Sequence, residues 1–262
     1  MEWINKCQEV YGSGDDDQQV NLSTKDILQK SIKSPSKDLL KKLFSLIDLT
    51  TLNTNDNAGT ALKFCKNLND FGGLFPGIPS LAAICVYPTL VKPVKENLTA
   101  SGIKIAAVGA GFPSSQTFIS VKIAECELLV TKGADEIDIV ISVGRFLAGE
   151  YQQVFDEISL IKSRIGKTHL KVILETGLLK TAENIRLASL IAMEAGADFI
   201  KTSTGKLSPA ATVEAAFTMS KAIRDYHSVT GRMVGLKPAG GIATVDDAIS
   251  YYSVVHHILG AK

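Results

Sequence analysis

The chain has 262 residues, of which 45 % are hydrophobic, and its 28 Lys and Arg residues balance 27 Asp and Glu residues. This length fits one α/β barrel domain, and the near-neutral charge provides no basic surface for nucleic acid or a membrane. No apolar stretch reaches the ~18 residues of a membrane-spanning helix, and the N-terminus lacks the basic-then-apolar order of a signal peptide. We therefore expect a soluble, cytoplasmic protein that binds neither nucleic acid nor membranes.

Residues 1–40 are polar and include the acidic, turn-rich run YGSGDDDQQ. This composition argues against a place in the core. We predict two short helices here, one beginning near Ser23 or Thr24 and one with Ser34 as N-cap and Pro35 at the first helical position. Residues 1–40 are interpreted as a leader packed outside a barrel domain that spans 41–262. A mobile tail is the alternative.

From residue 41 onward, short apolar runs alternate with longer segments of helical periodicity. The apolar runs are LFSLIDLT, LAAICVYP, IKIAAVGAGF, ADEIDIVI, LKVILET, ADFIKTS and RMVGLKP. Strands of this kind, separated by helices, are typical of a parallel sheet covered on its outer face. About seven units are visible, close to the eight of a (β/α)8 (TIM) barrel. A doubly wound open sheet is the alternative, although no GxGxxG follows the first strand.

An internal repeat relates KGADEID, residues 132–138, to AGADFIK, residues 195–201. In each copy a helix ends at a glycine, which can adopt the left-handed conformation, and a strand begins at once. Equal offsets place Asp138 and Lys201 at the same height on the fourth and sixth strands and on the same type of face. Because alternate strands of a barrel supply side chains to one interior layer, these two residues are predicted to converge.

Lys201 is unusual for a strand buried on both sides. Burial disfavours the ammonium form and lowers the pKa of a lysine, and the neutral amine can attack a carbonyl carbon. Lys237 ends the next strand, and repulsion between neighbouring cations favours the neutral form of one of them. Both lysines lie where barrel active sites lie, at the carboxyl ends of strands. Lys201 is therefore expected to be a nucleophile. A structural salt bridge to Asp138 is the alternative.

Further polar residues and glycine loops are candidates for the same site. Glycine-containing loops follow both lysines, at residues 203–206 and 239–241, and such loops either bind phosphate through backbone N–H groups or simply form turns. Asp48 ends the first strand and either receives a substrate hydroxyl or caps the next helix. Lys171 and Glu175 share a face of the fifth strand and are expected to complete a polar network around the nucleophile. The four cysteines form no CxxC pair, and no histidine has ligand spacing, so neither metal nor cofactor is predicted.

Seven segments match one known family in unbroken order. They are IDLTTL (47–52), AICVYP (83–88), AGFP (110–113), ADEIDIV (134–140), ETG (175–177), DFIKTSTGK (198–206) and GLKPAGGI (235–242). On these segments the chain resembles the deoxyribose-phosphate aldolases from about Leu43 to the C-terminus. DFIKTSTGK together with KPAGG is highly specific, whereas AICVYP alone is weak.

The resemblance implies a class I aldolase that reversibly cleaves 2-deoxy-D-ribose 5-phosphate, a phosphorylated sugar, to D-glyceraldehyde 3-phosphate and acetaldehyde without a metal. Lys201 would form a Schiff base, Lys237 would lower the pKa of Lys201, and Asp138 would move protons through a water. The resemblance also implies substrate contacts, with the 5-phosphate held by Gly205, Lys206, Gly240 and Gly241 and the sugar hydroxyl region faced by Asp48 and Thr204.

One departure concerns barrel closure. The family continues past the seventh strand with a helix and a Gly-Ala-Ser-Ser or Gly-Ala-Ser-Thr strand that closes the barrel and binds phosphate. This sequence contains no such segment. We therefore expect a barrel without its last βα unit, whose free edges favour a homo-oligomer. The alternative is a truncated, catalytically impaired relative that acts only as a binding partner or is an unstable product. A transaldolase-like enzyme is a third, disfavoured by the KPAGG segment.

Overall fold

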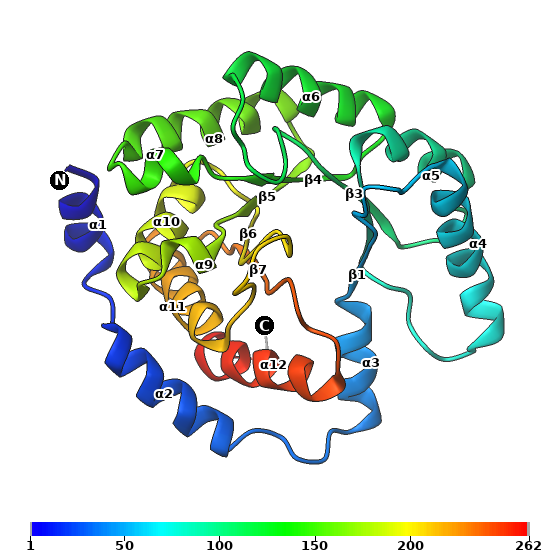
Figure 1. Cartoon of the computed structure of the whole chain (residues 1–262). Helices are drawn as coiled ribbons and strands as arrows, with labels where there is room; N and C mark the ends of the chain where they lie inside the picture. The colour runs from blue at the N-terminus through cyan, green and yellow to red at the C-terminus, as the bar shows by residue number, and fades with distance from the viewer. Residues whose placement is uncertain (1, 261–262) are drawn as a thin grey trace.

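Seven parallel strands form one curled sheet with helices on its outer side (Figure 1). The computed structural model describes residues 2–260. The strands pair strictly in chain order, so the sheet never reverses direction and the doubly wound alternative is wrong. Within residues 2–260, a TIM-type barrel without its last strand is confirmed. The strands are β1 (Asp48–Thr50), β2 (Ala83–Val86), β3 (Lys104–Val108), β4 (Glu136–Val140), β5 (His169–Ile173), β6 (Phe199–Lys201) and β7 (Gly235–Lys237).

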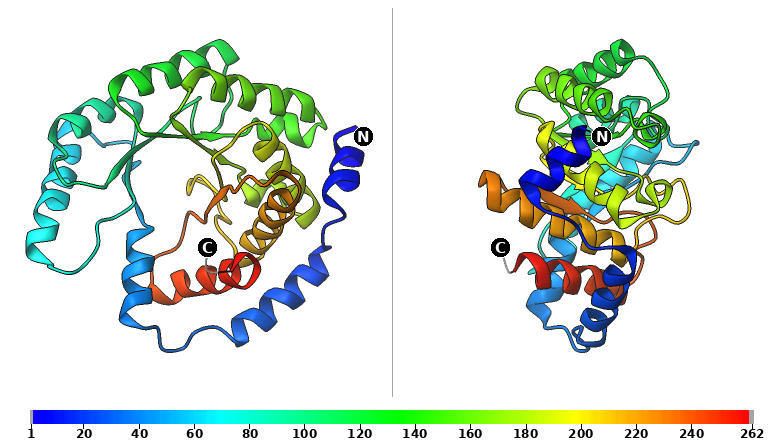
Figure 2. Two further views of the ribbon diagram at one scale, coloured as in Figure 1. Left: turned by 180° about the vertical axis from the view of Figure 1, so that it is seen from behind. Right: turned by 90° about the vertical axis from the view of Figure 1, so that its left-hand side faces the viewer.

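Helices follow the strands and cover the outer face of the sheet (Figure 2). They are α4 (Ala58–Leu74), η1 (Pro88–Leu90), α5 (Val91–Asn97), α6 (Ile119–Lys132), α7 (Val143–Leu147), α8 (Tyr151–Ile165), α9 (Thr176–Leu179), α10 (Ala182–Glu194), α11 (Val213–Thr230) and α12 (Val245–Leu259). The glycine stops of the internal repeat are confirmed, since Gly133 and Gly196 have φ angles of 98° and 101°. No helix within residues 2–260 is long and apolar enough to cross a membrane.

The two faces of the strands have different roles. Outward residues such as Ile137, Leu170 and Ile200 belong to the large apolar core between the sheet and the helices. Their neighbours Asp138 and Lys171 are also buried but lie on the opposite face. The two-residue strand period thus anchors the strands through their outward apolar side chains and places the polar side chains of β4 and β5 inside the curl.

The N-terminal helices differ from those predicted. The helix α1 (Glu2–Tyr11) was not expected at all, and α2 (Asp17–Gln29) begins well before Ser23. The N-cap of α2 is Asp16, whose carboxylate accepts from the N–H of Gln19. The helix α3 (Lys37–Ser45) has Ser36 as its N-cap rather than Ser34, because the Ser36 hydroxyl can reach the N–H of Leu39. The missed signal was the buried stripe of Trp3, Cys7 and Tyr11 in α1, which has helical spacing.

The helices α1 and α2 lie along the outside of α10, α11 and α12 (Figure 1). The buried guanidinium of Arg186 donates to the carbonyl oxygens of Tyr11 and Gly12 at 2.8 and 3.1 Å. The Asp17 carboxylate accepts from the N–H of Ala182 at 2.7 Å. Residues 2–29 are therefore tied to the barrel helices, in contrast to a mobile tail. The division into a 1–40 leader and a 41–262 barrel domain stays a prediction.

The curled sheet has an open seam between β1 and β7. Among residues 2–260, β1 pairs only with β2 and β7 only with β6. Side-chain contacts of Lys237 cross the seam instead. Its Nζ donates to the carbonyl oxygen of Leu46 at 2.9 Å and to Asp48 Oδ1 at 2.6 Å. The edges of both strands thus keep unpaired backbone groups.

Candidate active site

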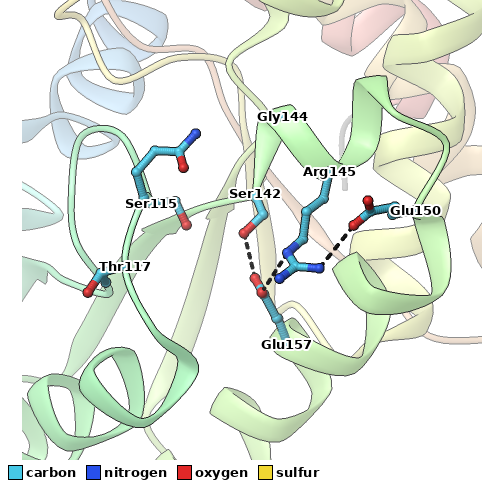
Figure 3. A pocket seen from close by; sticks show the side chains of 8 residues that line it. Ser115, Thr117, Ser142, Gly144, Arg145, Glu150 and Glu157 are labelled. Carbon is cyan, nitrogen blue, oxygen red and sulfur yellow. Dashed lines mark hydrogen bonds and ion pairs between the residues drawn. The ribbon is translucent and has the colours of Figure 1, made fainter.

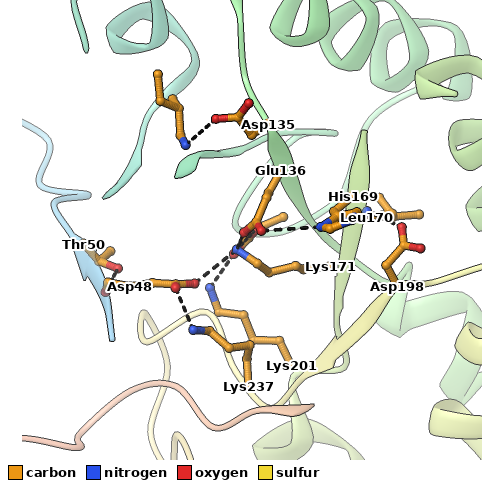
Figure 4. A network of polar contacts seen from close by, with 12 residues as sticks. Asp48, Thr50, Asp135, Glu136, His169, Leu170, Lys171, Asp198, Lys201 and Lys237 are labelled. Carbon is orange, nitrogen blue, oxygen red and sulfur yellow. Dashed lines mark hydrogen bonds and ion pairs between the residues drawn. The ribbon is translucent and has the colours of Figure 1, made fainter. Parts of the chain in front are cut away.

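Three lysines and three carboxylates meet inside the curl of the sheet (Figure 4). They come from five of the seven strands and are Asp48, Glu136, Asp138, Lys171, Lys201 and Lys237. With the acids ionised and the amines protonated, the formal charges of the six groups cancel. Balanced charge of this kind is what allows several ionisable groups to be buried together.

The predicted convergence of Asp138 and Lys201 is confirmed. Lys201 Nζ donates to Asp138 Oδ2 at 2.7 Å, and Asp138 is completely buried. The backbone register shows why they meet. Asp138 pairs with Lys171 of β5, whereas Lys201 pairs with Ile173, two residues further along the same strand. That stagger is typical of the tilted strands of a barrel, where residues of one interior layer are offset along the ladder.

Lys171 occupies the centre of the network and is 1 % exposed. Its Nζ lies 2.5 Å from Glu136 Oε2, 3.1 Å from Asp48 Oδ2 and 3.2 Å from Asp138 Oδ1. The expected place of Lys171 beside the nucleophile is thus confirmed. The same expectation for Glu175 is wrong, because Glu175 follows the end of β5 and contacts Thr204 instead.

Glu136 is a member of the network that sequence reasoning missed. Its signal was available, because Glu136 precedes Asp138 by two residues and a strand places such residues on one face. Asp48 was recognised, but the interpretation of Asp48 as a helix cap is wrong. Asn57 caps α4, and both Asp48 oxygens accept from lysines.

Lys237 pairs with Lys201 in the backbone ladder, as neighbouring strand ends should. The expectation that Lys237 lowers the pKa of Lys201 is not met in this structure, because Asp48 compensates the Lys237 charge at 2.6 Å. Burial by itself lowers the pKa of Lys201, but the Asp138 carboxylate outweighs burial, and the pKa of Lys201 is raised above its ordinary value.

The neighbouring charges also favour the ionised forms of Asp138 and Lys171. Burial favours the neutral form of Asp138, yet Lys201 and Lys171 outweigh it and lower the pKa of that carboxyl below its usual 3.8. Burial opposes the charge of Lys171, but Asp138, Asp48 and Glu136 together raise its pKa. The charged forms of Asp138, Lys171 and Lys201 are therefore mutually stabilised in the resting network.

This geometry still allows a neutral amine to form. Removing a proton from Lys201 to solvent would leave the buried network with a net charge of −1. Transfer of that proton to Asp138 leaves the network neutral and needs no movement of heavy atoms, because the two groups are already hydrogen bonded at 2.7 Å. The arrangement can thus supply a nucleophilic amine and an adjacent acid in one step.

The glycine loops after β6 and β7 touch one another. A Cβ on Gly240 would lie 3.2 Å from Gly205 Cα and 2.6 Å from the Ala210 side chain, so only glycine fits at this contact. The side chain of Lys206 reaches across to the carbonyl oxygen of Leu52, and Gly241 has open space beside it. The structure brings these residues together at the carboxyl end of the sheet. Their role in phosphate binding stays a prediction.

Cys85 lies on the interior face of β2, close to the network. It is completely buried, and burial together with the Asp138 charge raises the pKa of its thiol to about 12. A thiol of this pKa stays protonated near neutral pH, so Cys85 packs rather than reacts.

A separate polar pocket of about 380 Å³ lies between the loops after β3 and β4 (Figure 3). Arg145 in this pocket is held by Glu150 at 2.9 Å and by Glu157 at 3.4 Å. None of the six network residues lines this pocket. The Arg145 guanidinium is already compensated by these two carboxylates. The pocket therefore offers a weaker candidate for catalysis than the lysine network.

The lowered pKa of Asp138 predicts how stability depends on pH. A carboxyl whose folded-state pKa is lowered contributes stability that is present above its unfolded pKa, here 3.8, and is lost as pH falls through the folded-state pKa. The difference in free energy of unfolding between the wild type and Asp138→Asn should thus be constant between about pH 7 and pH 5 and shrink below pH 3.8. Urea unfolding at each pH measures it. A difference that grows in acid would contradict the assigned direction.

Comparison with known proteins gives consistent matches. The family described as DeoC/LacD family aldolase matches residues 43–256. The deoxyribose-phosphate aldolase of Homo sapiens is 40 % identical over 237 residues, covering 84 % of this chain and 73 % of the human protein. The Mus musculus protein of the same name is 41 % identical over 236 residues, with the same coverage of 84 % and 73 %. The tetrameric deoxyribose phosphate aldolase from Aeropyrum pernix has a TM-score of 0.66 at 26 % identity, covering 88 % of this chain and 90 % of that one.

Proposed function

The chain belongs to the DeoC/LacD family of aldolases, and from that premise we propose that it reversibly cleaves 2-deoxy-D-ribose 5-phosphate through a Schiff base on Lys201. The observation that supports this most is the 2.7 Å contact between Lys201 Nζ and the buried Asp138 carboxylate within a charge-balanced network. A lysine with an acid–base partner is what amine catalysis of a carbon–carbon cleavage requires.

The proposed reaction starts with proton transfer from Lys201 to Asp138. The neutral amine attacks the C1 aldehyde of the open-chain sugar, and Asp138 then gives its proton to the carbinolamine hydroxyl. This hydroxyl leaves as water, which yields a protonated Schiff base and an ionised Asp138. Asp138, acting through a water, takes the proton of the C3 hydroxyl, and the C2–C3 bonding electrons move into the iminium. D-glyceraldehyde 3-phosphate leaves. The remaining enamine is protonated at C2, and hydrolysis releases acetaldehyde and the free lysine.

The substrate contacts follow from the positions of the loops. Gly205, Lys206, Gly240 and Gly241 hold the 5-phosphate, because the loops after β6 and β7 meet and present one lysine with glycine backbone. Asp48 and Thr204 face the sugar hydroxyl region. Lys237 keeps Asp48 in place through their 2.6 Å ion pair.

Turnover of deoxyribose 5-phosphate tests this function. Release of glyceraldehyde 3-phosphate is expected, and an excess of a metal chelator should leave the rate unchanged, because no step uses a metal. The alternative, an impaired relative that only binds a partner, is supported by the open seam between β1 and β7. A well-folded protein without turnover under these conditions would favour that alternative.

We also propose that the chain self-associates. The edges of β1 and β7 carry unpaired backbone groups, and exposed edges pair readily with other chains. Sedimentation velocity should show a concentration-dependent species larger than the 28.0 kDa monomer. A protein that stays monomeric at all concentrations would contradict this expectation and would mean that α12 and the Lys237 contacts protect the seam sufficiently.

A further inference from the structure

Glu175 occupies an unusual position at the junction of β5 and α9. It has a left-handed backbone, with φ 55° and ψ 57°, although it is not glycine. Its side chain is buried, with 2 % of the residue exposed. A strained backbone that carries a buried carboxylate persists only when surrounding contacts hold it, and such positions concentrate at functional sites.

The backbone on either side of Glu175 is tied to the end of the strand that carries the nucleophile. The N–H of Leu174 donates to the carbonyl oxygen of Lys201, and the N–H of Thr176 donates to that of Thr202, both at 2.9 Å. The left-handed turn between these two bonds leaves the Glu175 side chain free to reach the loop that follows β6.

The Glu175 carboxylate holds that loop through Thr204. It accepts from the Thr204 hydroxyl at 2.5 Å and from the Thr204 N–H at 3.3 Å. The same hydroxyl oxygen accepts from the N–H of Lys206 at 3.1 Å. A continuous chain of hydrogen bonds thus runs from Glu175 through Thr204 to the backbone of Lys206. Within residues 2–260 the Glu175 side chain has no ion-pair partner, and both hydrogen bonds that its carboxylate accepts come from this loop.

We infer that Glu175 is a positioning residue that sets the Thr204–Lys206 loop for the phosphorylated end of the substrate, an inference that rests on the proposed aldolase function. Glu175 touches no network lysine in the described hydrogen bonds and ion pairs, so it acts on binding through Thr204 rather than on the amine chemistry.

Glutamine cannot replace these contacts, although it has the same shape and keeps the backbone strain unchanged. Its single acceptor can meet either the Thr204 hydroxyl or the Thr204 N–H, and its NH₂ group then faces the other. When the NH₂ group faces the N–H, two donors oppose each other. When it faces the hydroxyl, the hydroxyl oxygen must accept from both the amide and Lys206, and its proton loses the Glu175 acceptor.

The test is the steady-state kinetics of Glu175→Gln with deoxyribose 5-phosphate. The KM should rise about tenfold or more, in line with the loss of a hydrogen bond to a charged group, whereas kcat should change less than about threefold. Borohydride trapping of acetaldehyde on Lys201 should proceed at the wild-type rate, because this two-carbon probe does not depend on the loop.

Thr176→Val is the matched control. Thr176 is adjacent to Glu175 and 3 % exposed, and its hydroxyl has no hydrogen-bond partner among the described residues, so its removal should leave KM unchanged. Thr204→Val should reproduce the KM defect, and Thr204→Ser, which keeps the hydroxyl, should largely restore it. Combining Glu175→Gln with Thr204→Val should add little to either single KM defect, because both substitutions break the same hydrogen bond between Glu175 and Thr204.

The possible failures are distinguishable. A wild type that neither turns over substrate nor traps acetaldehyde overturns the proposed function. An active wild type with an unchanged KM in Glu175→Gln overturns the inference, as does an equal loss of acetaldehyde trapping. If Glu175→Gln does not fold, the comparison of Thr204→Val with Thr204→Ser decides, and equal KM values in these two variants overturn the inference.

Discussion

Replacement of Lys201 is expected to eliminate the adduct that borohydride traps with acetaldehyde and to lower turnover by about 10⁴-fold or more, as removal of a covalent nucleophile does. In the wild type, reduction of the Schiff base should leave a two-carbon group on Lys201, which peptide mass spectrometry can locate. Trapping reports bond formation at one side chain, so it tests the nucleophile directly, independent of substrate binding and product release.

The choice of variant follows from the buried charge. Lys201→Ala removes one cation beside the completely buried Asp138 and leaves the network with one more carboxylate than lysines, although Lys171 remains 3.2 Å from Asp138. Breaking a buried ion pair on one side costs up to about 3–5 kcal/mol of stability. Lys201→Arg keeps a cation near Asp138 but has no amine that can form a Schiff base. Both variants should be inactive, and the arginine variant should unfold at a higher urea concentration. A label that appears mainly on Lys237 or Lys206 would refute the assignment.

The second large effect is expected for Asp138→Asn, which should retain the fold and lower turnover by about 10²–10⁴, the range for an acid–base group. Asparagine can still accept a hydrogen bond from Lys201, but it cannot take up and return a proton at catalytic pH. Near-normal turnover in this variant would mean that Asp138 is only the ion-pair partner of Lys201.

The pH dependence separates the two roles. Asp138 raises the pKa of Lys201 against the effect of burial, and Lys171, which remains in the variant, acts in the opposite direction. The pKa of Lys201 should therefore fall in Asp138→Asn, and acetaldehyde trapping should begin at lower pH than in the wild type. Slow turnover despite an easily formed amine would show that proton transfer is the lost function. Trapping that instead begins at higher pH would contradict this role.

Asp198→Asn provides the matched control for this variant. Asp198 belongs to the same DFIK segment as Lys201, and its carboxylate pairs with Lys162 at 2.7 Å and accepts from the N–H of Leu170. The Asp198 carboxylate makes none of the contacts within the lysine network. Loss of this carboxylate should lower stability but leave turnover within about threefold of the wild type.

Much of the fold could be predicted from the sequence because it depends on local periodicity. The alternation of apolar runs with helical segments identified the parallel strands, and the glycines at 133 and 196 marked where two helices end. The two-residue strand period, applied to an internal repeat, was sufficient to place Asp138 and Lys201 in one layer. The N-terminal helices were misplaced, because the buried stripe of α1 lies within a segment whose overall composition is polar.

The partners of each charge were decided only by the tertiary structure. Asp48 and Lys171 are 123 residues apart and lie on strands that are not neighbours, yet their side chains meet at 3.1 Å. Their contact depends on the curvature of the sheet, which the periodicity of a single strand does not encode. Periodicity states which face a side chain lies on, whereas curvature and stagger determine what it meets there. For this reason the sequence identified Lys237 as a neighbour of Lys201, but only the curled sheet showed that Asp48 compensates its charge.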